Sequence, residues 1–152
     1  GRMGRKHPNI ITSLELRSEE MEVINLRIQK KYKEIEEKEV RFEEYLLDDA
    51  EYAIVAFGSA ARIAKKSIEI ARSQGIKVGL LRPITLWPFP TKEVQKLAGK
   101  VKGILSLEIN AGQMVEDIRL AVEGKVSVQH FGRLGGIIPD PDEVVDAIKR
   151  LF

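Results

Sequence analysis

Short hydrophobic runs alternate with amphipathic stretches over the last two thirds of this chain. The runs have the length and the β-branched content of buried strands, and they are 52–57, 76–81, 103–108 and 126–131. Helical spacing between them predicts helices at 60–73, 91–97, 110–122 and after residue 140. The alternation predicts an α/β fold with a parallel-type sheet that helices cover on both faces. Functional loops should then gather at the carboxyl ends of the strands.

A long amphipathic helix is predicted ahead of this part. Ser18 is a favoured N-cap residue, and Glu19 and Glu20 follow in the first turn, where the helix dipole favours acids. An apolar stripe then recurs at helical spacing through Met21, Ile24, Ile28, Tyr32, Ile35, Phe42 and Leu46. No proline or glycine lies between Ser18 and Asp49, so we predict one helix of about 28 residues. The pattern favours a helix on the surface of its own subunit or of a partner, with a coiled coil as the alternative.

These patterns divide the chain into two parts. Residues 1–50 form a linker with the long helix, and residues 51–152 form the α/β domain. The length of this α/β part is typical of a single domain. Charge is uneven, since residues 18–51 carry six basic and twelve acidic side chains. This interleaved acidic stretch argues against a nucleic-acid-binding arm.

Several classes of protein are disfavoured by what the sequence lacks. No run of about 18 apolar residues is present, so we expect no membrane span. The basic start is followed by no apolar segment of a signal peptide, and a cytoplasmic location is expected. The chain has no cysteine, and His7 and His130 lie far apart, which argues against disulfides, cysteine-ligated clusters and a metal site.

The run 81–90 holds three of the six prolines and the only tryptophan. Three prolines in eight residues exclude a helix or an inner strand, so this proline loop should be stiff and extended at the end of a strand. It is either a packed structural turn or a contact site. Arg82, Trp87 and Phe89 are its candidate interface residues, and Arg82 could also bind an anion or pack as a structural arginine.

Glu108 ends the third predicted strand, with Asn110 and Gln113 close behind it. A glutamate in this place could act as a general base or a polar clamp. Without a partner histidine or second acid, we favour Asn110 as the cap of the next helix and Glu108 as a local or interface ion pair.

Two glycine-containing loops complete the strand ends. The turn at 57–60 could hold a phosphate, but a tight turn with Ser59 as N-cap is favoured because the usual phosphate-loop spacing is absent. The loop 131–136 has three glycines and Arg133, and it is either an anion nest or a loop that lies flat against a neighbour, which we favour. We therefore predict no catalytic, cofactor-binding or metal-ligating residue.

Four segments of this chain in order resemble one known family, and they are 55–62, 79–90, 108–114 and 131–136. Together they are similar to the C-terminal part of the α subunit of 2-oxoacid:ferredoxin oxidoreductases, over residues 51–152. The upstream helix fits the linker before that domain. Residues 87–90 and 133–136 resemble the branched-chain (2-oxoisovalerate) type. The resemblance implies a fold similar to the transketolase C-terminal domain.

The resemblance also implies a function. These multisubunit oxidoreductases decarboxylate a 2-oxoacid on thiamine diphosphate with magnesium, pass electrons through iron–sulfur clusters to ferredoxin, and transfer the acyl group to coenzyme A. The implied partners of this domain are the N-terminal domain of the same subunit and the β and other subunits, with no nucleic acid and no membrane. The domain would serve assembly, would bind none of these cofactors itself, and would be inactive alone. Its candidate interface residues are Arg82, Trp87, Phe89, Glu108, Asn110, Gln113 and Arg133.

Two alternatives stay open on the sequence. One is a free-standing nucleotide- or phosphate-binding α/β module that uses Gly58, Ser59 and the loop 132–136. The other is an adaptor in which the helix from Ser18 forms a homodimeric coiled coil.

Overall fold

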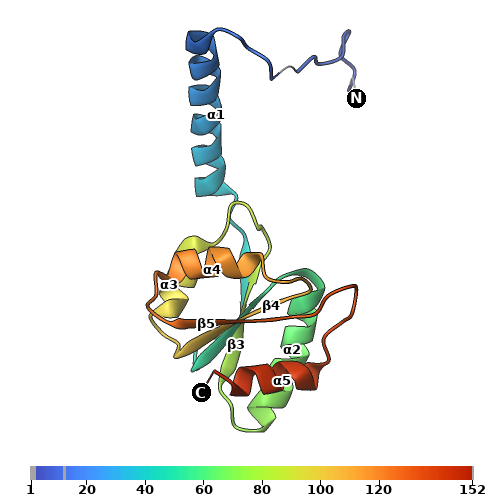
Figure 1. The fold of residues 1–152 in the computed structure, drawn as a ribbon, viewed down its shortest axis with the longest axis vertical. Coiled ribbons are helices and arrows are strands. Elements are labelled where there is room, and N and C mark those ends of the chain that lie inside the picture. The colour runs from blue at the N-terminus through green and yellow to red at the C-terminus, as the bar shows by residue number, and fades with distance from the viewer. Residues whose placement is uncertain (1–2, 12, 152) are drawn as a thin grey trace. The chain divides into compact units, whose positions relative to one another are not determined.

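The computed structural model describes residues 3–11 and 13–151, which divide into two compact units between Ile35 and Glu36. Most of α1 (Ser18–Lys38) belongs to the first unit (Figure 1). The helix includes Ser18, which was expected to cap it, as its first residue, and Glu19 and Glu20 lie in the first turn, as predicted. None of its residues is buried. Among the described residues, no helix combines the length and the apolar content needed to cross a membrane.

The predicted end of this helix is wrong. It ends at Lys38 rather than near Asp49, and residues Phe42–Tyr45 form a strand, β1, antiparallel to β3 (Val78–Pro83). Glu43 and Tyr45 are the two half-buried residues of this strand. Pairing with β3 supplies the backbone hydrogen bonds that a helix would otherwise supply, and such tertiary contacts override a weak local preference. The sheet-containing unit therefore starts at Glu36, ahead of the boundary expected at residue 51.

The sheet has five strands in the order β1-β3-β2-β4-β5. All neighbours except β1 and β3 are parallel, as the alternating pattern predicted. The remaining strands are β2 (Tyr52–Ala56), β4 (Gly103–Glu108) and β5 (Ser127–Gly132). The helices of this unit are α2 (Gly58–Ser73), α3 (Thr91–Ala98), α4 (Met114–Val122) and α5 (Pro141–Lys149). The predicted α/β fold is confirmed, with β1 making the sheet mixed.

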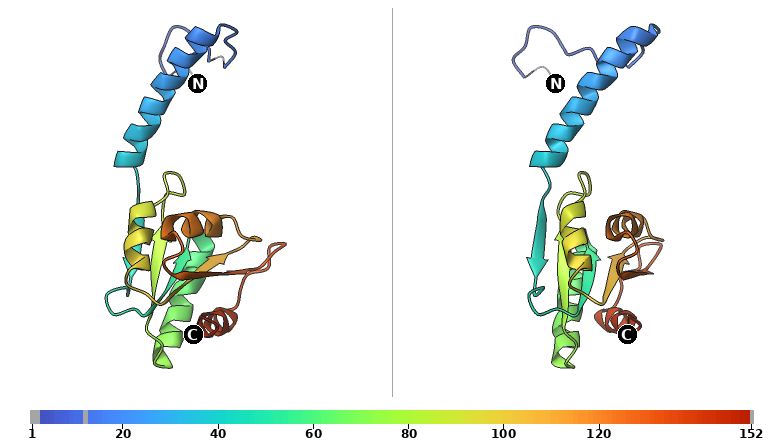
Figure 2. Two further views of the ribbon diagram at one scale, coloured as in Figure 1. Left: turned by 60° about the vertical axis from the view of Figure 1, so that its left-hand side comes forward. Right: turned by 90° about the vertical axis from the view of Figure 1, so that its left-hand side faces the viewer.

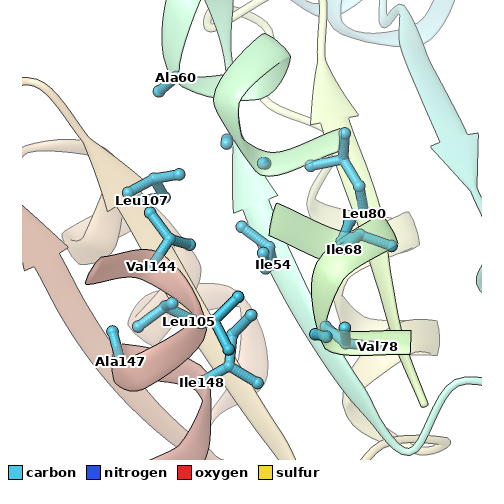
Figure 3. Close-up of a cluster of buried hydrophobic side chains, with 14 of the residues drawn as sticks. Ile54, Ala60, Ile68, Val78, Leu80, Leu105, Leu107, Val144, Ala147 and Ile148 are labelled. Carbon is cyan, nitrogen blue, oxygen red and sulfur yellow. The ribbon is translucent and has the colours of Figure 1, made fainter. Parts of the chain in front are cut away.

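Helices cover both faces of the sheet in pairs. On one face α2 packs beside α5, and on the other α3 packs beside α4 (Figures 1 and 2). The core under α2 and α5 is a cluster of fully buried aliphatic side chains that includes Ile54, Ile68, Leu80 and Ile148 (Figure 3). Burial of each such side chain stabilises the fold by roughly 1.5–3 kcal/mol. Burial on both faces explains why the inner strands read as continuous apolar runs.

The strand order reverses direction beside β2. The chain passes from β2 to β3 on one side and later returns to β4 on the other. In doubly wound sheets, ligand sites lie at the carboxyl ends of the strands where this reversal occurs. The loops after β2 and β4 leave from this place, and the loops after β3 and β5 flank it.

A test of the β1 placement comes from Gly79, which is buried in β3. A Cβ at this residue would lie 2.4 Å from the Leu46 carbonyl oxygen and 2.7 Å from Leu47 Cδ2, in the turn after β1. Gly79→Ala should therefore displace that turn and lower the free energy of unfolding by about 1–3 kcal/mol in urea denaturation. Gly99→Ala is the control, since its nearest contact would be at 3.5 Å. Equal stability of the two variants would contradict the placement of β1.

Candidate functional site

Glu108 is the best-defined polar group at the carboxyl edge of the sheet. It ends β4, and its side chain is fully buried. One carboxylate oxygen, Oε2, accepts hydrogen bonds from the backbone N–H groups of Gln113 (3.1 Å) and Met114 (2.9 Å). The other, Oε1, accepts from the Val115 N–H (3.0 Å) and the Ser106 hydroxyl (2.9 Å). The carboxylate therefore caps α4 from the preceding strand.

These hydrogen bonds keep the Glu108 carboxylate ionised. Burial by itself would raise the pKa of Glu108, but the bonds from Gln113, Met114, Ser106 and Val115 outweigh it and hold the pKa below its ordinary value. The start of α4 also favours a negative charge because the helix dipole is positive there. Both oxygens face the protein's own donors, so this glutamate acts as a structural anchor. Of the roles considered for it from the sequence, local pairing fits this geometry.

The capping residues predicted from the sequence are both wrong. Asn110 does not cap α4; its Oδ1 accepts from the Gly112 N–H at 2.7 Å and shapes the loop before the helix. Gln113 occupies the N-cap position without a side-chain capping bond. Likewise α2 starts at Gly58 after Phe57, again without a side-chain capping bond, so Ser59 is not its cap. Prediction from local spacing fails for α4 because the actual acceptor lies five to seven residues upstream of its donors.

The loops after β4 and β5 pack against each other around His130. Glu108 and Gly132 are partners in the β4–β5 register. A Cβ at Gly132 would lie 2.2 Å from the Asn110 carbonyl oxygen and 2.7 Å from His130 Cε1, so glycine is required here by close approach. His130 Nε2 lies 3.9 Å from Glu108 Oε1 and, among the described residues, this buried atom has no hydrogen-bond partner. No local sequence pattern connects His130 with Glu108, because only the strand register brings them together.

Arg82 pairs within the chain, across the β1–β3 seam. Its Nη1 lies 2.9 Å from Glu43 Oε2, and Lys65 Nζ lies 2.5 Å from Glu43 Oε1. Hydrogen bonds from Lys65 and then from Arg82 hold the pKa of the Glu43 carboxyl below its usual value. Both ion pairs are about one-third exposed, so each contributes little to stability. Of the roles expected for Arg82, the structural one fits this arrangement.

The proline loop is fixed by hydrogen bonds to the segment before β1. The Ile84 and Thr85 N–H groups donate to the Arg41 carbonyl at 2.9 and 3.1 Å, and the Thr85 hydroxyl donates to the Pro88 carbonyl at 2.9 Å. Phe89 packs against the core cluster under α3 and α4, whereas Trp87 is 55% exposed. Ile84 and Leu86 are also exposed. The loop is therefore anchored from inside and presents large apolar side chains outward.

Arg133 binds the loop after β5 to the start of α5, with its Nη1 3.3 Å from Glu143 Oε1. The candidate residues thus form two groups on either side of β2. Arg82, Trp87 and Phe89 belong to the β3 side, and Glu108, Asn110, Gln113 and Arg133 belong to the β4–β5 side. Asn110 is half-buried and Gln113 is exposed, so their side chains can reach a neighbour, whereas the buried Glu108 can act only through the loop that it holds.

Residues 50–144 match the family model described as pyruvate:ferredoxin oxidoreductase core domain II. The chain belongs to this family. Core domain II thus accounts for the whole α/β part from β2 to the start of α5.

Two relatives that match this core domain II chain over 143 residues extend the similarity upstream of residue 50. Ketoisovalerate oxidoreductase subunit VorB of Methanothermobacter thermautotrophicus is 46% identical over 94% of this chain and 40% of its own. 2-Oxoglutarate synthase subunit KorA of Methanothermobacter marburgensis is 31% identical over 68% of this chain and 28% of its own. The chain spans about two fifths of the length of the VorB relatives.

Solved structures share the fold of this core domain II chain. 2-Oxoglutarate:ferredoxin oxidoreductase from Magnetococcus marinus, solved with 2-oxoglutarate, coenzyme A and succinyl-CoA, matches with a TM-score of 0.75 and 20% identity, over 90% of this chain and 24% of that one. A split-gene transketolase, solved as an inactive β4 tetramer, matches with a TM-score of 0.60 and 13% identity, over 72% of this chain and 42% of that one. These likenesses confirm the expected transketolase-like fold.

Removing the charge of Glu108 tests its capping role. Glu108→Gln would leave buried N–H groups of α4 poorly paired, and should lower the free energy of unfolding by about 2–3 kcal/mol at neutral pH. Because the folded-state pKa is lowered, this stabilisation is full above the ordinary pKa of 4.5 and is lost as pH falls through the folded-state value. In urea denaturation from pH 7 to pH 3, the wild-type and Glu108→Gln proteins should therefore differ in free energy of unfolding at neutral pH, and this difference should become smaller only at the acidic end.

The exposed Glu116 of α4 provides the matched control. Glu116→Gln should change stability by no more than about 0.5 kcal/mol at any pH. A Glu108→Gln protein as stable as the Glu116→Gln protein would contradict the capping role.

Proposed function

We propose that this chain is the C-terminal assembly domain of the α subunit of a branched-chain 2-oxoacid:ferredoxin oxidoreductase. The observation that carries the proposal is the proline loop, whose Phe89 is packed on the core while Trp87, Ile84 and Leu86 are exposed. Large apolar side chains on a rigid support are typical of interface anchors. The 46% identity to a ketoisovalerate oxidoreductase subunit supports the branched-chain assignment.

The proposed partners are the N-terminal domain of the same subunit and the β and other subunits of the complex. That complex would use coenzyme A and ferredoxin in the cytoplasm. The two groups of candidate residues lie on both sides of β2, so they would contact different neighbours or two parts of one neighbour. In this proposal Trp87 provides apolar area, whereas Asn110, Gln113 and Arg133 provide polar contacts around it.

The sequence has no cysteine for an iron–sulfur cluster, and the described residues form no ligand group for a metal ion. An iron–sulfur cluster needs cysteine thiolates, and the sequence has none. Within residues 3–11 and 13–151, no three His, Asp or Glu side chains gather as they would to hold a metal ion. The Glu108 carboxylate is engaged with α4. We therefore assign thiamine diphosphate, magnesium and the clusters to other parts of the complex, and no chemical step to this domain.

Truncation of the exposed tryptophan tests the assembly role. Trp87→Ala, made in the complete subunit, should weaken its association with the partner subunits by ten-fold or more, measured by size-exclusion chromatography across a dilution series. The melting temperature of the present chain should change little, because the Trp87 side chain is more than half exposed.

Arg62→Ala, on the exposed face of α2, removes a long exposed side chain from outside this loop and should leave assembly unchanged. Arg82→Ala should weaken assembly less than Trp87→Ala, since Arg82 pairs internally with Glu43. If the Trp87→Ala complex assembles with wild-type affinity, the proline loop is not an assembly contact.

Ligand titration separates this proposal from a free-standing nucleotide-binding module. Calorimetric titration of the chain with magnesium–thiamine diphosphate, coenzyme A and ADP in turn should give no binding heat. Micromolar binding of ADP would instead favour the nucleotide-binding module. That binding should then be lost in Ser59→Asp, because the substitution places an acid at the start of α2, where a phosphate would bind.

A further inference from the structure

The sheet has two outer edges that differ in chemistry. One is β1, and the other is β5, as the sheet order shows (Figure 2). Among the residues that the structure describes, no backbone hydrogen bond joins the outer side of β5 to another segment. The strand is six residues long, and after its first residue every residue is half-buried. An edge of this kind exposes backbone donors and acceptors that another strand can pair with.

Proteins normally protect such an edge, and β1 shows how. It is only four residues long, it carries Glu43 and Glu44, and Arg41 immediately precedes it. By contrast, β5 reads Ser-Val-Gln-His-Phe-Gly and contains no lysine, arginine, acid or proline. Short length and charge are the usual devices that prevent edge-to-edge pairing. Only β1 has them, so β5 is the edge suited to pairing.

The charge pattern of α5 favours a second copy of this chain as the partner of the β5 edge. The carboxyl end of this helix contacts β5, since the Arg150 carbonyl accepts from Gln129 Nε2 at 2.9 Å. The helix has Asp142 and Glu143 in its first turn, and Lys149 and Arg150 at its end. In a second copy related by a two-fold axis perpendicular to the sheet, α5 would run in the opposite direction on the same face. The acidic start of each α5 would then lie toward the basic end of the other.

We propose that β5 pairs antiparallel with β5 of a second copy of this chain, which joins the two sheets into one. A helix is about 10 Å wide and strands are about 4.8 Å apart, so one helix covers roughly two strands. Because α5 packs against β4, the strand next to β5, the two α5 helices would face each other across the paired strands. In this pairing, β5 has no acid, lysine or arginine that would meet a like charge on the other strand. A pair of β1 strands, by contrast, would bring glutamates close to each other.

The oligomeric state of the full chain, measured by sedimentation equilibrium, tests this pairing. The chain should be a dimer at tens of micromolar. Arg150→Glu, at an exposed position, should raise the dimer dissociation constant by ten-fold or more at low salt, because it places acids opposite acids. The charge reversal Arg62→Glu, on the exposed face of α2, is the matched control and should leave the dissociation constant unchanged.

Two further measurements identify the contact. Hydrogen exchange of a peptide that covers residues 127–132 should slow as the dimer forms, whereas a peptide that covers 42–45 should not. Ile28→Lys in the apolar stripe of α1 should leave dimerisation intact. A chain that stays monomeric at a concentration of hundreds of micromolar, a dimer lost in Ile28→Lys, or unchanged exchange in β5 would each overturn the proposal.

Discussion

The carboxylate of Glu108 is the interaction on which the carboxyl edge of this domain depends. Its four hydrogen bonds join the end of β4 to the first turn of α4 and fix the loop between them. A buried charge without partners would be costly, but here the helix start supplies the donors and the favourable dipole. The loop that Glu108 fixes also packs closely against the end of β5, where the Asn110 carbonyl oxygen leaves no room for a Cβ at Gly132.

The sequence predicted the elements whose hydrophobic pattern is local. The inner strands β2, β3 and β4 are apolar runs because helices cover both faces, and each strand from β2 to β5 was predicted within a few residues. The strand β1 was missed because it is short, half-exposed and held by β3, which lies about forty residues further along the chain. Phe42 also continued the helical stripe, so the sequence pattern supported the wrong element.

The sequence identified the residues of the candidate site better than it identified their contacts. The strand-end position of Glu108 and the unusual proline content of 81–90 were visible in the sequence. That Glu108 caps α4, and that Arg82 binds Glu43, depends on register and on pairing across long stretches of chain. His130 carried no sequence signal that linked it to Glu108, although the register places it within 4 Å of that carboxylate. Residue type thus marks a candidate, and topology decides its partner.

The proline loop and the loop after β4 are ordered by contacts within the domain, and this order affects how strongly they can bind a partner subunit. A loop that must be ordered on binding costs conformational entropy, which reduces the affinity that its contacts provide. The proline loop is already held by Arg41, Thr85 and the packed ring of Phe89, and the loop after β4 is held by Glu108. Both can contact a neighbour without further ordering of the backbone. The hydrogen bonds of these two loops are made within the domain. They keep the loops rigid, which is what the proposed assembly role requires.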